Sequence, residues 1–226
     1  MRFRVPKPLH GWREFLGEVG IIVLGVLVAL GAEQVAEAIH WRGEVATFRQ
    51  AVESEIALDL GTYQYRMREN GCVERRLDEL QSWVNGWRSG SPSTLTGPIG
   101  VPASLAPNTS VWGSRSSEIV SHMPPSALLG YSDLYDEFSN NEDHRLDERS
   151  AWLELSGFDG ATQLDHHDLI QLQSLITRAR FRDQRITLNA LNYFRKAAKL
   201  GIRSRWDPSW APAEKVICQP ILPKGG

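Results

Sequence analysis

The run Asp165-His166-His167-Asp168 is the densest group of metal-binding and acid–base side chains in the sequence. Carboxylates and imidazoles ligate many metal ions, so the run is a candidate metal site. Adjacent residues of a helix point about 100° apart, however, and no H-E-x-x-H pattern extends the two histidines. Asp165 and Asp168 match the polar start of a helix instead. We therefore expect neither a metal nor another cofactor here.

Nucleophilic and phosphate-binding motifs do not occur either. The stretch Ser114-Arg115-Ser116-Ser117-Glu118 lacks the G-x-S-x-G turn of a hydrolase, and the chain contains no S-x-x-K or G-x-x-x-x-G-K pattern. His122 precedes two prolines, where a helix would end. Tryptophans at helical spacing are more typical of a core than of a ligand cleft, and the chain has such residues at Trp83, Trp87, Trp112 and Trp152. The sequence thus predicts no catalytic residue and favours a protein that is not an enzyme.

Cys72 and Cys218 are the two cysteines of the chain. If the domain lies outside the cytoplasm, we expect them to form a disulfide that ties the C-terminal tail to the first long helix. The alternative is a pair of unrelated buried thiols. No C-x-x-C pattern is present, so the sequence gives no support to a thiol redox enzyme.

Charge is distributed unevenly, although the formal net charge is only −2. Residues 133–168 hold eleven acidic and two basic residues, whereas residues 169–205 hold nine basic residues and a single acid. One interpretation is a basic surface for an anionic polymer, lipid or nucleic acid, formed by Arg178, Arg182, Arg185, Arg195, Lys196 and Lys199. We favour the other interpretation, in which two neighbouring antiparallel helices neutralise each other.

Residues 19–32 form an apolar run of fourteen residues without a charge. As a helix it spans about 21 Å, against about 30 Å for the hydrocarbon core of a bilayer. Flanking apolar residues lengthen it, and a helix from about Trp12 to Trp41 would cross a membrane with a tryptophan near each interface. Three interpretations compete: an uncleaved signal anchor, a signal peptide cleaved at Ala36-Glu37-Ala38, and a core helix of a soluble protein.

The flanks of the run favour the anchor. Basic residues are concentrated before it, at Arg2, Arg4, Lys7 and Arg13. Residues 33–60 contain no proline and keep a helical spacing, whereas a cleavage site must be extended. The positive-inside rule then predicts a cytoplasmic basic N-terminus at 1–18, a transmembrane anchor at 19–40 and an extracytoplasmic domain from residue 41.

The stretch Gly11-Trp12-Arg13-Glu14-Phe15-Leu16-Gly17-Glu18-Val19-Gly20, continued through Val35, resembles the N-terminus of an uncharacterised family of bacterial single-pass membrane proteins. In that family a GE(V/I) element precedes a short apolar helix that ends in a polar turn with a glutamine. Arg75-Arg76-Leu77-Asp78-Glu79-Leu80 and His122-Met123-Pro124-Pro125 are similar to segments of the same group. The resemblance implies an anchor in the bacterial inner membrane and a periplasmic domain, and it implies no activity.

The anchor itself offers candidate contact residues. Glu14 and Glu18 lie one turn apart at the membrane edge, where an acid marks a proton path or a partner contact, or simply snorkels to the interface beside Arg13; we favour snorkelling. Small-xxx-small pairs, which permit close helix association, are formed by Gly25 with Ala29 and by Ala32 with Ala36. The expected partners are the membrane and either another membrane or periplasmic protein or a second copy of the chain, with no nucleic acid.

Beyond the anchor, the pattern is helical. Apolar residues recur in steps of three and four from Trp41 to Trp87, with a candidate interruption at Asn70-Gly71. Residues 89–110 are rich in proline, glycine and serine and predict a long loop.

Three further helices are expected. The first is short, at 111–122, and the second runs from about 125 to 155 with a candidate bend at Asn140-Asn141. The last, from about 169 to 200, has a seam that is apolar except at Asp183. We expect Asp183 at the solvated edge of the bundle rather than buried beside an arginine.

The predicted fold is therefore all-α, a transmembrane helix followed by an antiparallel bundle of long helices at 41–201, with a Pro/Trp-containing tail at 202–226 packed on it. Mean hydropathy of −0.31 and near-neutral charge exclude a multi-pass membrane protein and argue against a dedicated nucleic-acid binder. We expect a single-pass membrane protein that acts through protein contacts, as scaffold, accessory subunit or sensor-like module. The alternatives are a membrane-tethered envelope hydrolase without a recognisable motif, and binding of an anionic polymer or lipid by the basic helix 178–199.

Overall fold

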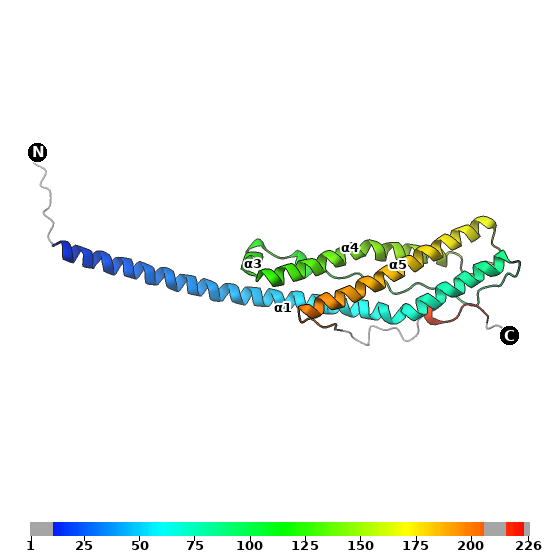
Figure 1. Ribbon diagram of the computed structural model, residues 1–226, viewed down its shortest axis with the longest axis horizontal. Helices are drawn as coiled ribbons and strands as arrows, with labels where there is room; N and C mark the ends of the chain where they lie inside the picture. Colours follow the sequence, from blue (N-terminus) through cyan, green and yellow to red (C-terminus); the bar gives the residue numbers. More distant parts are fainter. Residues whose placement is uncertain (1–10, 206–215, 224–226) are drawn as a thin grey trace, which may run out of the picture.

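The computed structural model describes residues 11–205 and 216–223. Its first element, α1 (Trp12–Arg88), is one helix of 77 residues, which corresponds to a length of about 115 Å. The candidate interruption at Asn70-Gly71 is wrong: the helix passes through it, and the space beside Gly71 is open. Figure 1 shows the N-terminal part of α1 projecting as a rod from one end of a bundle.

The projecting part of α1 carries the apolar run. Ile21, Leu24 and Val28 are 74%, 63% and 64% exposed, and Val45 is the first buried residue among those described. The run is therefore not a core helix of this domain. Among the described helices, α1 alone is long and apolar enough to cross a membrane. The membrane-length segment and the first helix of the folded domain are thus one continuous helix.

After α1 the chain runs back along the bundle without regular structure. This return segment, residues 89–109, ends where α2 (Ser110–Gly113) begins. α2 and α3 (Ser117–His122) replace the single short helix predicted at 111–122, because the side chain of Ser116 accepts the N–H of Ile119 and starts a new helix.

α4 (Pro125–Ser156) and α5 (His166–Lys199) form a long hairpin (Figure 1). α4 continues through Asn140-Asn141 as one helix of 32 residues. Asp165 and Asp168 form a capping box at the start of α5. The chain turns away after α5 at Gly201, whose φ of 77° suits glycine.

The directions of the helices follow from their contacts. Tyr131 of α4 donates to Glu53 of α1, and further along both helices Glu148 accepts from Arg66, so α1 and α4 run in the same direction. Gln173, near the start of α5, pairs with Gln81 near the end of α1, so α5 runs against both. The hairpin is antiparallel as predicted, whereas α1 and α4 are parallel because the return segment lies between them.

The core has two parts. One is rich in aromatic side chains, which include Tyr63, Trp112 and Tyr135; the other surrounds Trp83 and Trp152. Residues of the tail complete both parts, since Ile202 packs in the first, and Ile217 and Ile221 pack in the second. Trp206 and Trp210, expected in the packed tail, lie outside the described residues. The predicted all-α fold is confirmed for the part of the chain that the structure describes.

Candidate functional site on helix α1

Five charged side chains lie inside the domain on one face of α1. Their spacings of four, seven, three and seven residues repeat the turn of a helix. Each is between 1% and 6% exposed, although charged side chains are seldom buried unless they are paired. We call this set the charged row; it consists of Glu55, Asp59, Arg66, Glu69 and Arg76.

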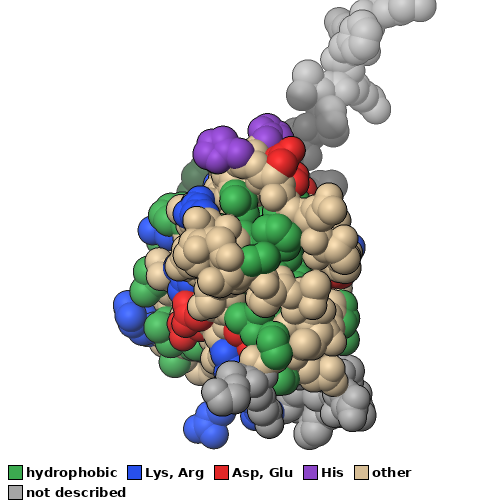
Figure 2. Space-filling model, turned by 90° about the vertical axis from the view of Figure 1, so that its right-hand side faces the viewer, with side chains coloured by type: hydrophobic (Ala, Val, Ile, Leu, Met, Phe, Trp, Pro, Cys, Tyr) green, Lys and Arg blue, Asp and Glu red, His purple; other side chains and the backbone are tan. Residues whose placement is uncertain are grey.

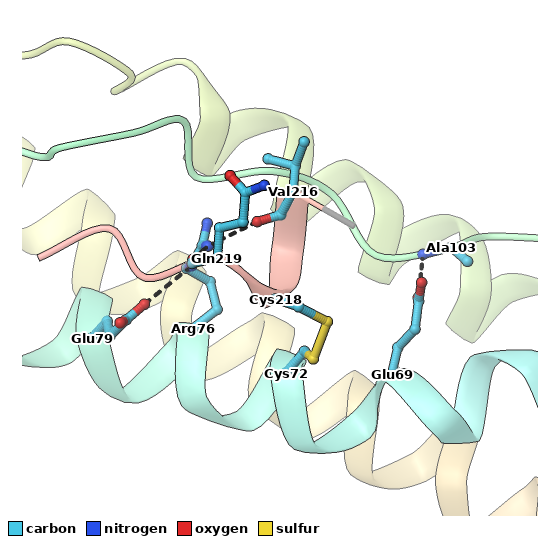
Figure 3. The surroundings of a disulfide bond; sticks show 8 residues. All are labelled: Glu69, Cys72, Arg76, Glu79, Ala103, Val216, Cys218 and Gln219. Atoms are coloured by element: carbon cyan, nitrogen blue, oxygen red, sulfur yellow. Dashed lines mark hydrogen bonds and ion pairs between the residues drawn. A yellow bond between two sulfur atoms is a disulfide. The ribbon is translucent and has the colours of Figure 1, made fainter. Parts of the chain in front are cut away.

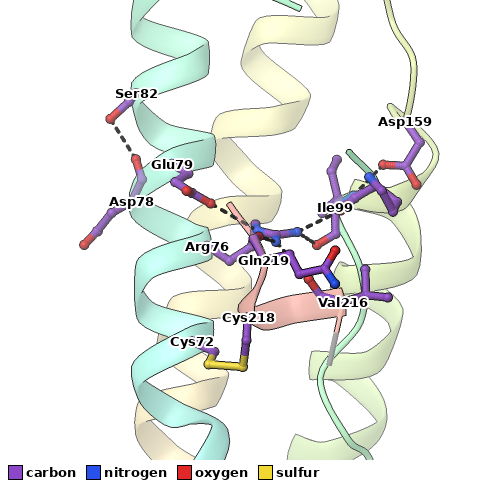
Figure 4. A network of polar contacts seen from close by, with 11 residues as sticks. Cys72, Arg76, Asp78, Glu79, Ser82, Ile99, Asp159, Val216, Cys218 and Gln219 are labelled. Carbon is purple, nitrogen blue, oxygen red and sulfur yellow. Dashed lines mark hydrogen bonds and ion pairs between the residues drawn. A yellow bond between two sulfur atoms is a disulfide. The ribbon is translucent and has the colours of Figure 1, made fainter. Parts of the chain in front are cut away.

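Arg76 holds two separate segments against α1 (Figure 4). Its guanidinium donates to four main-chain carbonyl oxygens, two in the return segment and two in the tail: those of Pro98, Ile99, Val216 and Gln219. Burial lowers the pKa of Arg76, and the nearby Glu79 carboxylate opposes that shift. Because an arginine stays charged, one cation satisfies the carbonyl groups of two segments that lack regular partners.

One turn before Arg76, a disulfide joins Cys72 to Cys218, with an S–S distance of 2.05 Å (Figure 3). The bond fixes η2 (Val216–Cys218) on α1 across a sequence separation of 146 residues. The structure thus brings together the two cysteines that the sequence singled out. A bond that closes so long a loop restricts the unfolded chain strongly, by about 5 kcal/mol in the chain-entropy treatment.

The acids of the charged row accept main-chain N–H groups. Three such hydrogen bonds, 2.8–2.9 Å long, join Glu69 to Ala103, Asp59 to Asn108 and Glu55 to Val111. Figure 3 shows the first of them, with Glu69 pointing from α1 to the return segment. A buried segment without secondary structure needs partners for its N–H groups, and α1 supplies them from its own side chains.

Arg66 lies in the middle of the charged row and joins all three long helices. Its Nη2 lies 2.6 Å from Glu148 Oε1 of α4 and 2.6 Å from Asp183 Oδ1 of α5. The expectation that Asp183 lies at the solvated edge is wrong: Asp183 is 2% exposed, because Arg66 compensates its charge. Burial acts to lower the pKa of Arg66, but the two carboxylates outweigh it and raise the pKa.

Asp59 is the acid of the charged row whose pKa is clearly shifted. Its pKa is raised to about 7, mainly by burial and further by the charge of Glu55, while the N–H of Asn108 opposes the rise. Its Oδ2 has no hydrogen-bond partner among the described residues. Glu55 is better satisfied, since Tyr135 Oη donates to it over 2.7 Å. Asp59 therefore exchanges its proton near neutral pH.

A cleft of about 450 Å³ lies over this part of the row, between the return segment with α2 on one side and α4 on the other. Its inner wall is the stacked pair Trp112 and Tyr135, whose ring centroids are 5.2 Å apart. Arg115 lies over the Trp112 ring at 4.5 Å. Of the four tryptophans expected in the core, Trp83 and Trp152 are fully buried, whereas Trp112 also lines this cleft.

The six residues of the predicted basic surface fall into two groups. Three of its residues form ion pairs with acids of α4: Arg178 and Arg182 with Asp147, and Lys196 with Asp133 and Glu137. These pairs support mutual neutralisation of the two helices. The other three, Arg185, Arg195 and Lys199, are exposed.

The candidate contact residues of the anchor lie on the projecting part of α1. Glu18 is exposed, and the side chain of Glu14 lies outside the described residues. Both small-xxx-small pairs, Gly25 with Ala29 and Ala32 with Ala36, are exposed, and the space beside Gly25 is open. Nothing in the described part of the chain covers this segment.

The histidine run lies at the opposite end of the molecule. His166 and His167 are exposed in the first turn of α5. The carboxylates of Asp165 and Asp168 accept main-chain N–H groups in the capping box. Figure 2 looks onto this end, where histidines lie at the edge and hydrophobic, acidic and basic side chains are mixed. No group of three or more potential metal ligands gathers within the described ranges.

The charged row was not identified from the sequence, although a signal for it exists. Four of its members directly precede an apolar position of the helical seam: Glu55, Asp59, Arg66 and Arg76 precede Ile56, Leu60, Met67 and Leu77. A charged residue repeatedly placed at the border of an apolar seam indicates a second contact face on the same helix. What the sequence does not show is that this face meets main-chain groups.

Comparison of the chain with models of protein families, with curated proteins and with solved structures finds no match. The geometry must therefore carry the functional argument. In the described part of the chain, α1 uses buried charges to hold a hairpin, an irregular segment and a tail against itself.

Proposed function

We propose that this chain is a single-pass membrane protein whose helical domain lies outside the cytoplasm and acts through protein contacts, as a scaffold, accessory subunit or sensor-like module. The observation that carries the proposal is the continuity of α1 from the exposed apolar run into the core of the domain. A helix without a break fixes the orientation of the domain on the membrane. A flexible tether would leave that orientation free.

Two features support the orientation. Basic residues precede the apolar run, at Arg2, Arg4, Lys7 and Arg13, which favours a cytoplasmic N-terminus. The disulfide between Cys72 and Cys218 belongs to an oxidising compartment. A bacterial inner membrane with the domain in the periplasm satisfies both conditions.

The internal use of polar groups supports a role in contact rather than in catalysis. Arg66 and Arg76 bind groups of the chain itself, and the acids of the charged row hold its main chain. Such bracing keeps the outer surface of the bundle in one shape, which reduces the entropy lost when a partner binds. Exposed apolar residues on α5, such as Phe181 and Leu188, are positions at which to look for that partner.

Topology reporters test the proposal directly. A phosphatase that is active only outside the cytoplasm, fused after the tail, should be active, and an N-terminal tag should stay with the domain in the carbonate-washed membrane. Loss of the tag would indicate a cleaved signal peptide. Recovery of the chain in the soluble cytosolic fraction would contradict the proposal. As a control, Leu24→Arg combined with Val28→Arg should abolish membrane retention.

Partner capture tests the second half of the proposal. A photo-crosslinking residue at position 181 or 188 should give discrete adducts in membranes, because both side chains are more than half exposed. The same residue at position 176, inside the core, is the matched control and should give none. Absence of adducts from a scan of all exposed helix positions would speak against a role in protein contact.

A further inference from the structure

A groove of about 320 Å³ lies where α1 leaves the bundle toward the apolar run. One wall is α1 itself, and the other is the end of α3 with the residue that leads into α4. The residues that define its character are Trp41, Arg42, Val45, Arg49, His122 and Pro124. Its volume lies at the lower end of the range of ligand pockets. We call it the membrane-proximal groove.

The groove has unused positive charge. The residues three and four positions before and after Arg42 are Ala38, Ile39, Val45 and Ala46, so no acid shares its helix face. Arg42 is exposed and has no ion pair within the described part of the chain. Arg49 is partly engaged, since it contacts Glu53 at 3.3 Å and Tyr131 at 3.4 Å.

An aromatic pair shapes the rest of the groove. The rings of Trp41 and His122 are stacked, with centroids 4.2 Å apart and planes 8° from parallel. Nδ1 of His122 is held by the carbonyl oxygen of Glu118 and by the Ser121 hydroxyl, which directs Nε2 away from α3. The groove therefore offers an aromatic wall and the Arg42 side chain to one ligand.

The position of the groove on α1 sets its height above a bilayer. A hydrocarbon core of about 30 Å takes about 20 residues, so a core that begins at Val19, the first residue of the expected anchor, ends near Ala38. Arg42 then lies about 6 Å beyond that boundary, near the level of the lipid phosphates. Trp41, one residue earlier, lies where interfacial tryptophans are found.

We propose that the membrane-proximal groove binds the phosphate of an anionic phospholipid headgroup. Arg42 supplies the charge-assisted hydrogen bonds, Trp41 and His122 form the wall, and the absence of a free acid beside Arg42 favours a headgroup whose negative charge is not cancelled by an ammonium. The inference rests on the proposed anchoring of the chain. A bound headgroup would fix the rotation of α1 about its axis as well as its depth.

Native mass spectrometry of the full chain in mild detergent tests the proposal. The probes are phosphatidylglycerol and phosphatidylcholine with identical acyl chains, added separately, and inorganic phosphate as competitor. We expect retention of phosphatidylglycerol over phosphatidylcholine. Arg42→Gln should weaken that retention about tenfold, whereas Arg42→Lys keeps most of it. Arg185→Gln is the matched control, because it removes an exposed arginine about 35 Å further along the bundle.

Each result decides the question. Equal retention of the two lipids, or equal loss in the Arg42→Gln and Arg185→Gln proteins, overturns the inference. Displacement of phosphatidylglycerol by millimolar inorganic phosphate assigns the site to free phosphate and also overturns it. Membrane retention of the same proteins is measured first. A chain that is not retained fails the proposed function, whereas a chain that is retained without lipid preference fails the inference alone.

Discussion

Arg66 Nη2 of α1 lies 2.6 Å from Asp183 Oδ1 of α5, in a pair whose side chains are 7% and 3% exposed. The same nitrogen contacts Glu148 of α4 at 2.6 Å. The three long helices therefore meet at one guanidinium, which fixes their relative heights along the bundle. Apolar contacts alone fix the position of one helix along its neighbour only weakly, because Leu and Ile side chains tolerate small displacements along the helix axis. A buried ion pair does not tolerate such displacements.

Replacement of Arg66 should be among the most costly changes in the domain. Arg66→Met leaves two buried carboxylates without a cation, so we expect the free energy of unfolding to fall by about 3 to 5 kcal/mol. Denaturant unfolding of the full chain in mild detergent, followed by circular dichroism, measures it. Arg180→Met is the control: its ion pair with Asp78 is exposed, and the expected loss is below about 1 kcal/mol. Similar losses in both proteins would contradict the role of Arg66.

Asp59 should make stability depend on pH. The unfolded carboxyl titrates near 3.8 and the folded one near 7, so the folded state holds a proton between these values. Stability is then greatest at the acidic end and falls as the pH rises from about 4 to about 7. Asp59→Asn removes this loss and should be more stable than the natural protein at pH 8 by about 4 kcal/mol, and similar at pH 4. Unfolding curves at pH 4 to 8 measure the difference; the exposed Asp136→Asn should leave the pH profile unchanged.

Loss of the disulfide should loosen the tail. The protein with Cys72→Ser and Cys218→Ser should lose about 5 kcal/mol of unfolding free energy. Hydrogen exchange should rise in residues 216–223 and in the part of the return segment held by Arg76, while the α4–α5 hairpin keeps its protection. Reductant should lower the stability of the natural protein and leave the double variant unaffected. An unchanged exchange pattern would show that Arg76 and the packing of Ile217 and Ile221 hold the tail without the disulfide.

Substitution by alanine should change stability in opposite directions at two glycines of α1. The space beside Gly71 is open, so Gly71→Ala should add about 1 kcal/mol through helix propensity. A Cβ at Gly86 would lie 2.9 Å from the main-chain oxygen of Ser91, whose N–H donates to the Gly86 carbonyl. Gly86→Ala should therefore destabilise the end of α1 by about 1 to 2 kcal/mol. Thermal unfolding of the two variants gives the sign, and a gain in both would refute the close approach at residue 91.

The spacing of apolar residues was sufficient to predict the helices but not to predict how they are arranged. The strict seam of α5 and the apolar spacing of α1 on both sides of Asn70-Gly71 predict both elements, and the proline-rich stretch predicts the return segment. The Arg66–Asp183 pair is separated by 117 residues, and its recognition requires the knowledge that α5 packs antiparallel against α1. The sequence does not reveal the partners of Arg76 and Glu69, because these partners are main-chain groups.

The disulfide also has a consequence for biogenesis. At a synthesis rate of about 5 to 20 residues per second, Cys72 is made roughly ten seconds before Cys218, which follows 146 residues later. At the start of that interval neither the hairpin nor the tail has been made, so the charged row lacks its native partners. Cys72 is then a lone thiol in the compartment into which the domain emerges. With the domain outside the cytoplasm, as we propose, oxidoreductases that act on nascent chains meet this thiol before its native partner exists.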